Sequence, residues 1–177
     1  MERLNPTTTN SKKSTAFTLV ELLVVISIIA ILAGLSFPAV NGALDSAKKT
    51  HAKSNAVQIA AAVSAYEMEY GKLPTNSTKL VDLEFVKILT GSNTTYNSRG
   101  IVFLEPPTWK KGKGGTNDAG YCDPWSSNTP YSIALDTEYK NKVIVSTNGL
   151  ASGSYEIMRK VGVWNVAIPK YQVRSWD

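Results

Sequence analysis

Hydrophobic residues divide the chain into an apolar N-terminal stretch and a polar remainder with short periodic runs. From Leu22 to Val40 no side chain is charged, and Glu21 stands just before this stretch. A helix of that length rises by roughly 28 Å, which is close to the hydrocarbon thickness of a bilayer. The pattern predicts a membrane-spanning helical half over 17–40. Lys12 and Lys13 before it indicate a cytoplasmic N-terminus.

After Gly42 the continuous apolar pattern gives way to an amphipathic one. Apolar residues recur at steps of three and four, which is typical of one face of a helix. They are Ala56, Ile59, Val63, Tyr66 and Tyr70. No strong breaker lies between Gly42 and Gly71, so we expect one continuous helix from about Phe17 to Tyr70, on the order of 80 Å long.

A shorter helix and several strands are expected in the rest of the chain. Residues 78–90 have the apolar side of a helix, and Gly91 suits the stop that follows. Short apolar runs are typical of strands. Five such runs lie at 101–104, 131–135, 143–145, 155–158 and 161–168. Consecutive short strands predict an antiparallel meander that covers the long helix.

Composition and charge narrow the classes of function. A chain of 177 residues is long enough for one domain with a core. The net charge is +5 without a dense Lys or Arg tract, so we expect no nucleic-acid partner. The chain has one cysteine, Cys122, which excludes an intramolecular disulfide. Its one histidine, His51, makes a His-based catalytic triad an unnatural interpretation. Without a catalytic constellation an enzyme is not expected, and a membrane-tethered binding or enzymatic domain is kept as an alternative.

The sequence AFTLVE, which begins at Ala16, resembles the N-terminal signal of type IV pilins and type II secretion pseudopilins. The resemblance implies cleavage between Ala16 and Phe17 by a prepilin peptidase, followed by N-methylation of Phe17. Counted from Phe17, Glu21 is fifth and Pro38 is twenty-second, where the family has an acid and often a proline. Ala16 stands where the family usually has glycine.

These positions have a physical interpretation in an assembly. Cleavage gives Phe17 a cationic amine, and a buried carboxylate is tolerated when it is paired with a cation. We expect the Phe17 amine of one subunit to approach Glu21 of a neighbour in a helical filament. Pro38 lacks an N–H and predicts a kinked or loosened stretch. In a plain single-pass anchor, the alternative, Glu21 and Pro38 have no role in assembly.

A second segment extends the resemblance. Asp123-Pro124-Trp125, followed by Pro130-Tyr131, is similar to a segment of type II secretion major pseudopilins. Physically it predicts a turn in which Asp123 accepts hydrogen bonds from nearby amides and Trp125 covers the core.

Major pseudopilins often bind calcium in a loop of the β-region, and the residues after 135 bear on this expectation. Asp136, Glu138 and Asn141 offer oxygen ligands, but their spacing differs from an EF-hand and Lys140 counts against a dense anionic cage. We therefore expect no cofactor, with calcium as the alternative.

Residues 110–115, with the sequence KKGKGG, form a basic stretch. We expect a flexible, solvated loop there. A contact with another subunit or with a secretion partner is the alternative.

Taken together, the resemblance implies a structural subunit of a type II secretion pseudopilus with an α+β, pilin-like fold. Its expected parts are a leader at 1–16, the transmembrane and filament-core half at 17–40, and a periplasmic or extracellular globular domain at 41–177. The implied fold is a long N-terminal helix packed at its far end by a short second helix and a small antiparallel sheet. The expected partners are other copies of the chain, a prepilin peptidase, an inner-membrane assembly platform and the bacterial inner membrane. A type IV pilin for adhesion, motility or DNA uptake is the alternative.

Overall fold

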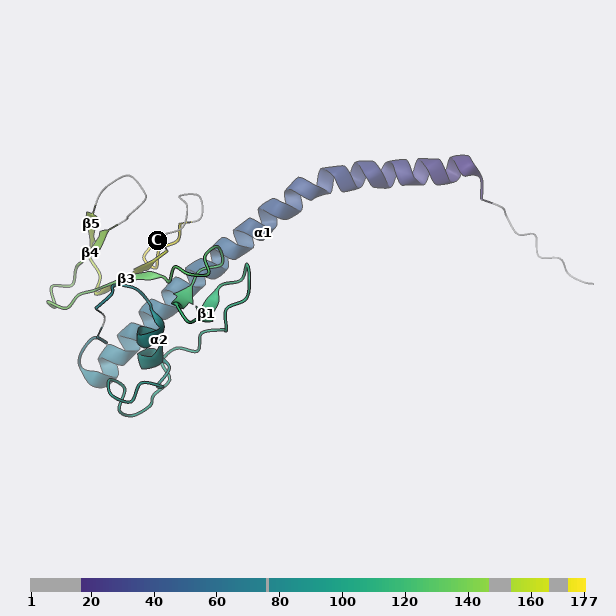
Figure 1. Ribbon diagram of the computed structural model, residues 1–177. Coiled ribbons are helices and arrows are strands. Elements are labelled where there is room, and N and C mark those ends of the chain that lie inside the picture. Colours follow the sequence, from purple (N-terminus) through teal and green to yellow (C-terminus); the bar gives the residue numbers. More distant parts are fainter. Residues whose placement is uncertain (1–16, 76, 147–153, 166–171) are drawn as a thin grey trace, which may run out of the picture. The chain divides into compact units, whose positions relative to one another are not determined.

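The computed structural model describes residues 17–75, 77–146, 154–165 and 172–177. The side chains of 35–39, 146 and 155 lie outside this description, as does the expected leader at 1–16. Two compact units make up the chain, Met1–Gly42 and Ala43–Asp177, and the helix α1 runs through both (Figure 1).

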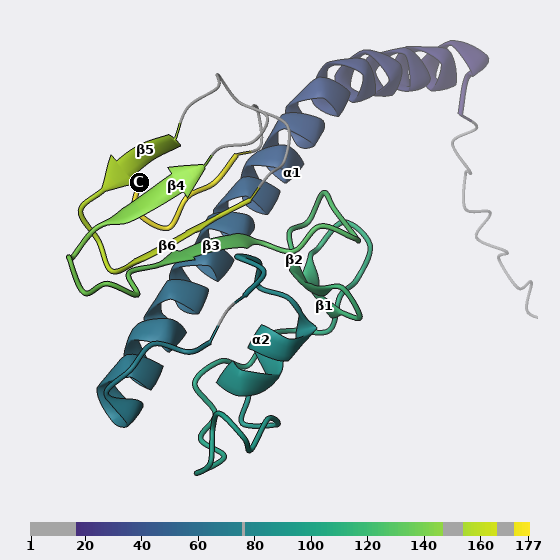
Figure 2. The same cartoon turned by 60° about the vertical axis from the view of Figure 1, so that its left-hand side comes forward.

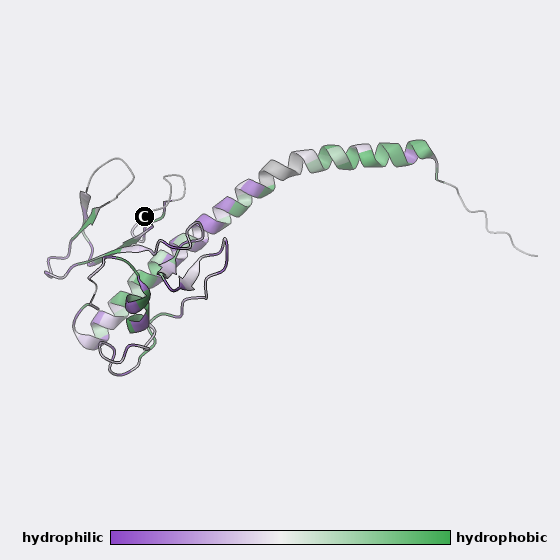
Figure 3. Ribbon diagram, viewed as in Figure 1, coloured by the Kyte–Doolittle hydropathy of each residue, from purple (hydrophilic) through white to green (hydrophobic). Residues whose placement is uncertain are grey.

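The long helix expected from the hydrophobic pattern is confirmed. α1 extends from Leu19 to Tyr70 over 52 residues. Its N-terminal half is almost uniformly apolar, whereas its second half alternates between polar and apolar positions (Figure 3). The change reflects the two environments that the pattern predicts, one apolar on every side and one apolar on a single face.

The amphipathic face of α1 forms one wall of the core of the second unit. Ala52, Ala56, Ile59, Val63 and Tyr66 are at most 1% exposed, and they share one cluster with residues of α2 and of the strands. Their spacing of three and four residues explains why a single helical face is buried. Figure 2 shows α2 and the strands gathered around this half of α1.

The second helix is shorter than predicted. α2 extends from Leu83 to Leu89, and the Asp82 side chain caps it by accepting a 2.9 Å hydrogen bond from the Phe85 N–H. Thr78 to Val81, expected to be helical, are not helical: Thr78 and Lys79 lie in a bend, and Lys79 has a φ of +57°. Leu80 forms an antiparallel bridge to Ser132, so pairing with a strand overrides the local helical pattern.

In the described part of the chain, six short strands form three antiparallel pairs. β1 (Gly115–Asn117) pairs with β2 (Gly120–Cys122), β3 (Ser132–Leu135) with β6 (Val161–Trp164), and β4 (Val143–Ser146) with β5 (Ser154–Ile157). The expected α+β class is confirmed, but the simple meander is wrong because β3 pairs with β6 across the intervening β4–β5 hairpin.

Two details of the predicted strands are also wrong. Residues 101–104 form no strand, because the N–H groups of Phe103 and Leu104 both donate to the Leu89 carbonyl at the end of α2. The β1–β2 hairpin was not expected from its polar sequence. Gly120 makes it possible: its φ is +129°, and a Cβ there would lie 2.4 Å from the Val81 carbonyl oxygen.

A group of buried ionisable side chains lies where β2 and β3 meet α1. The Tyr131 hydroxyl donates to the Ala52 carbonyl over 3.2 Å, and the rings of Tyr121 and Tyr131 stand edge to face. Burial raises the pKa of Tyr121 to about 12, the pKa of Cys122 to about 11, and the pKa of Tyr131 well above its ordinary range.

These raised pKa values predict loss of stability in alkali. Between the ordinary pKa values of about 9–10 and the raised ones, the unfolded chain releases protons that the folded chain retains, so rising pH favours unfolding. We expect the midpoint of thermal unfolding, followed by circular dichroism, to be steady up to about pH 9 and to fall progressively toward pH 12. Tyr131→Phe should flatten this fall, whereas Tyr139→Phe, at an exposed site, should not. A midpoint that stays constant from pH 8 to 11 would contradict the prediction.

Candidate functional site

A reciprocal pair of hydrogen bonds closes the N-terminus of α1. The Thr18 N–H and hydroxyl both donate to the Glu21 carboxylate, over 2.8 and 2.7 Å. In return the Glu21 N–H donates to the Thr18 hydroxyl oxygen over 3.2 Å. This arrangement is a capping box, which satisfies N–H groups that the first helical turn leaves without partners. Glu21 therefore has a partner within its own chain.

Thr18 is a functional residue that the sequence reasoning missed. The signal was present, because Thr18 and Glu21 have the spacing of a capping box immediately before an apolar run. Phe17 precedes the cap and is 74% exposed. Ala16, on the other side of the expected cleavage site, lies outside the described residues. The pairing of Glu21 with a neighbour's amine stays a prediction.

The apolar half of α1 exposes its hydrophobic side chains in every direction. All described residues from 17 to 34 are exposed, including Leu22 at 57%, Ile29 at 58% and Leu32 at 59%. Ser27, a polar member of this stretch, donates its hydroxyl to the Leu23 carbonyl over 2.7 Å, so it stays compatible with apolar surroundings. A surface of this kind requires a covering partner.

In the part of the chain that the structure describes, none of the helices has an apolar stretch of the length that a bilayer crossing requires. The side chains of residues 35–39, which belong to the expected transmembrane half, lie outside that part. The helix continues through position 38, and the predicted effect of Pro38 on packing stays a prediction.

The loop after β3 is organised around the buried carboxylate of Asp136, which is 4% exposed. One Asp136 oxygen accepts from the Lys140 N–H over 3.0 Å and the other from the Asn141 N–H over 2.6 Å. The Asp136 N–H donates to the Lys160 carbonyl, which ties the loop to the turn before β6. The carboxylate thus takes the place of a backbone acceptor in a tight turn.

This geometry does not fit a calcium cage. Both Asp136 oxygens accept N–H bonds, and the Glu138 carboxylate lies 2.5 Å from the Lys140 ammonium, which lowers the pKa of Glu138 and raises the pKa of Lys140. Calcium needs six to eight oxygen ligands. Among the described residues, no three His, Cys, Asp or Glu side chains are grouped closely enough to hold a metal ion.

The Asp123 turn has the predicted form and an additional link. One Asp123 oxygen accepts from the N–H groups of Trp125 and Ser126 over 2.9 and 2.8 Å, and Trp125 packs against the main core. The other oxygen accepts from the Asn165 amide over 2.8 Å, and the Asn165 oxygen accepts from the Val173 N–H. A buried polar network therefore joins this turn to the C-terminal segment, a link that spacing alone did not predict.

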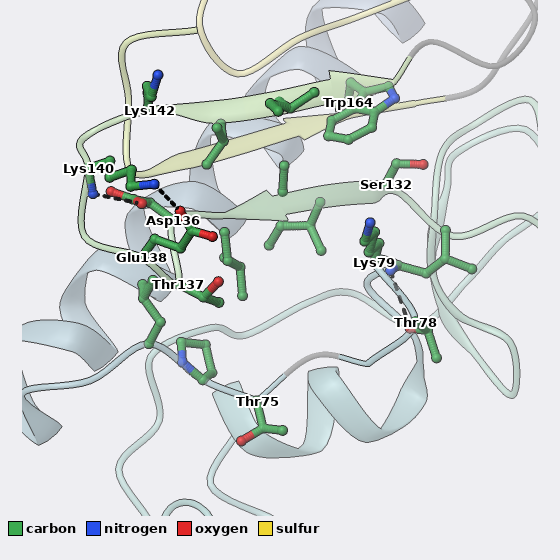
Figure 4. A pocket seen from close by; sticks show the side chains of 18 of the residues that line it. Thr75, Thr78, Lys79, Ser132, Asp136, Thr137, Glu138, Lys140, Lys142 and Trp164 are labelled. Carbon is green, nitrogen blue, oxygen red and sulfur yellow. Dashed lines mark hydrogen bonds and ion pairs between the residues drawn. The ribbon is translucent and has the colours of Figure 1, made fainter. Parts of the chain in front are cut away.

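A groove of about 1140 Å³ lies beside β3 (Figure 4). Its charged side chains come from the connection before α2 and from the Asp136 loop, and Trp164 lies at its far end. Glu138 is paired with Lys140, and Lys142 with Glu156. The first pair lies within the loop, and the second links the residue before β4 to β5.

Comparisons with known proteins agree with the N-terminal motif. Residues 11–37 match a family model described as "Prokaryotic N-terminal methylation motif". Type II secretion system core protein G of Escherichia coli (strain K12) is 33% identical over 90 residues, which are 51% of this chain and 62% of that protein. The protein of the same name from Pseudomonas aeruginosa is 33% identical over 125 residues, which are 68% of this chain and 72% of that protein. The match therefore spans less than two thirds of the Escherichia coli relative. No solved structure matches the chain significantly.

The Asp136 loop generates a prediction about stability. Asp136→Asn replaces one buried acceptor by a donor, and we expect it to lower the free energy of unfolding by about 1–3 kcal/mol. Because backbone N–H groups already satisfy the carboxylate, exchange between calcium chloride and a chelator should leave the thermal midpoint of the wild type unchanged. Glu138→Gln, at an exposed ion pair, is the matched control and should lower the free energy of unfolding by less than Asp136→Asn does. A rise of several degrees in calcium would show that the loop rearranges around the ion and would contradict this account.

Proposed function

This chain belongs to the family of type II secretion system core protein G, the major pseudopilins, and on that premise we propose that it is a structural subunit that polymerises into a pseudopilus. The observation that carries the proposal is the apolar half of α1, whose described side chains are exposed on every side. Identical helices packed side by side would cover this surface in a filament. The subunit performs no catalysis of its own.

Before assembly, the apolar half resides in the inner membrane, with the N-terminus in the cytoplasm and the globular unit in the periplasm. The uncharged run from Leu22 to Val40 supports residence in the membrane, and the orientation is the one implied by a signal that a prepilin peptidase cuts on the cytoplasmic side. A prepilin peptidase removes residues 1–16 and methylates the new amine of Phe17. An assembly platform in the same membrane then adds the subunit to the filament.

The capping box gives Glu21 a role in both states. In the separate subunit, two hydrogen bonds from Thr18 stabilise the carboxylate at the start of the helix. Two neutral donors do not cancel its charge, and a charge inside apolar surroundings is costly. In the filament, the Phe17 amine of the next subunit supplies the cation. Docking in the register that brings this amine to Glu21 therefore removes the free-energy cost of the unpaired carboxylate. In any other register the carboxylate stays unpaired and the cost remains.

The proposal predicts separate effects of Glu21 on insertion and on assembly. Glu21→Gln and Glu21→Leu should leave the subunit in the membrane fraction after carbonate extraction. Both should reduce filament formation strongly, since an unpaired Phe17 amine costs about 3 kcal/mol or more at each buried contact. Filaments recovered by shearing, relative to total subunit, provide the measurement.

Two variants separate the charge from the cap. Ser27→Ala removes a hydroxyl from the same apolar half and should assemble normally. Thr18→Val removes the capping hydroxyl but retains the carboxylate, so its defect should be smaller than that of Glu21→Gln. Equal defects in Thr18→Val and Glu21→Gln would mean that Glu21 acts only as a helix cap. Normal filaments from Glu21→Leu would refute the pairing between subunits.

A further inference from the structure

Six lysines of the Ala43–Asp177 unit lie on two segments that the proposed function does not use. We call these residues the basic patch: Lys48, Lys49 and Lys53 of α1, and Lys110, Lys111 and Lys113 of the turn before β1. Their combined charge exceeds the net charge of the whole chain, which is +5, so the remainder is close to neutral. Positive charge is therefore concentrated at two segments of one unit.

The two segments of the basic patch meet in the folded chain. The Lys48 ammonium lies 4.0 Å from the position that a Cβ on Gly112 would occupy. A cavity of about 290 Å³ between the segments is lined by His51 of α1 and by Thr108, Lys110 and Lys113. In both ribbon views the segment that leads into β1 lies beside α1 (Figures 1 and 2).

The turn that carries three of these lysines is closed by backbone hydrogen bonds and is exposed, and the expected flexibility of this loop stays a prediction. The Lys113 N–H donates to the Lys110 carbonyl over 2.9 Å, and the Lys110 N–H bonds to the Gly114 carbonyl. Gly114 has a φ of +72°, and a Cβ there would lie 2.9 Å from the Cys122 carbonyl oxygen. The lysines therefore project from a hydrogen-bonded turn, and such a turn has less backbone entropy to lose when they bind an anion than an open loop has.

Within the described residues, no acidic side chain forms an ion pair with any lysine of the basic patch. Glu105 and Asp118 are exposed in the same region of sequence. Most other described acids are already engaged: Glu67, Glu69, Glu84, Glu138, Glu156 and Asp177 in ion pairs, and Asp123 and Asp136 in buried hydrogen bonds. These eight acids thus already have partners within their own chain, which makes a second copy a weaker candidate as the partner of the basic patch.

The position of the basic patch in the chain favours a membrane surface as its partner. Lys48 follows Val40, the last residue of the apolar run, by eight residues, which reach at most about 28 Å even when extended. Long lysine side chains readily place their ammonium groups among lipid head groups.

We propose that the basic patch binds the phosphate groups of anionic phospholipids on the membrane surface next to the apolar half of α1. This inference rests on the proposed function, because it requires that the apolar half resides in a bilayer. The contact holds the globular unit at the membrane before assembly and is given up when the subunit enters the filament.

The test uses the full-length chain in vesicles of phosphatidylcholine alone or with about one third phosphatidylglycerol. Lysines are acetylated with acetic anhydride, a neutral reagent, and the rate at each lysine is read by mass spectrometry of peptides. A surface potential near −30 mV favours the protonated, unreactive amine about threefold. We therefore expect about threefold slower acetylation of Lys48, Lys110 and Lys113 in the anionic vesicles, lost at about 0.5 M salt.

Control residues and variants separate the outcomes. Lys72, which is exposed just beyond the far end of α1, should react equally in both vesicles. The double variant Lys110→Gln with Lys113→Gln should reduce the protection of Lys48, whereas Lys72→Gln with Lys87→Gln, equal in charge, should retain it.

Three outcomes would contradict the inference. If the chain floats with the vesicles but its lysines react equally in both kinds of vesicle, the inference is wrong and the proposed function is unaffected. Protection that depends on protein density and not on lipid charge would assign the patch to a second copy and overturn it too. Chain that fails to float would overturn the membrane residence in the proposed function, and the inference with it.

Discussion

A carboxylate has to be accommodated at the start of a helix half whose described surface is largely apolar and exposed on every side. Thr18 meets part of this demand by donating two hydrogen bonds to Glu21, and the exchange also caps the first turn of α1. Hydrogen bonds from neutral groups leave the negative charge in place, and only a cation can offset it in apolar surroundings. In our account that cation is the amine of Phe17 on a neighbouring subunit, which exists only after the first sixteen residues have been removed.

The same helix, α1, carries the globular unit, and its hydrophobic pattern changes along its length. The two halves of α1 therefore have different roles. Beyond Gly42 one face of α1 is buried by α2 and the strands, and the other stays polar. The packed face holds the unit through tyrosine contacts as well as apolar ones: the Tyr66 hydroxyl donates to the Tyr96 carbonyl and the Tyr70 hydroxyl to Asn97. One continuous element thus presents an assembly surface at one end and a folding surface at the other. Three lysines of the basic patch, Lys48, Lys49 and Lys53, follow the apolar half closely in sequence.

The elements predicted correctly are those whose pattern is long and regular. α1 follows from an uncharged run and then from periodic apolar positions, so tertiary contacts only reinforce what its sequence favours. Short elements were less predictable because distant partners decide them. Leu80 lies in a helical pattern but bridges to Ser132, and Leu104 lies in a strand-like run but bonds to the end of α2. The pairing of β3 with β6 depends on a chain reversal that local sequence does not encode.

The features of the candidate site also differ in how far the sequence predicts them. The positions of Phe17 and Glu21 were visible as sequence spacing, and so was the turn at Asp123. The capping role of Thr18 was equally visible but was missed. The engagement of both Asp136 oxygens with backbone N–H groups depends on how the loop closes, with Tyr139 and Asn141 both at positive φ, and spacing alone could not show it.

The central claim is that Glu21 is matched to an amine created by cleavage. Mass spectrometry of the N-terminus of the mature protein, isolated from cells that assemble it, tests this most directly. The account predicts a chain that begins with N-methylphenylalanine at Phe17. A mature chain that still begins at Met1 would contradict it, because Glu21 would then have no such cation to meet.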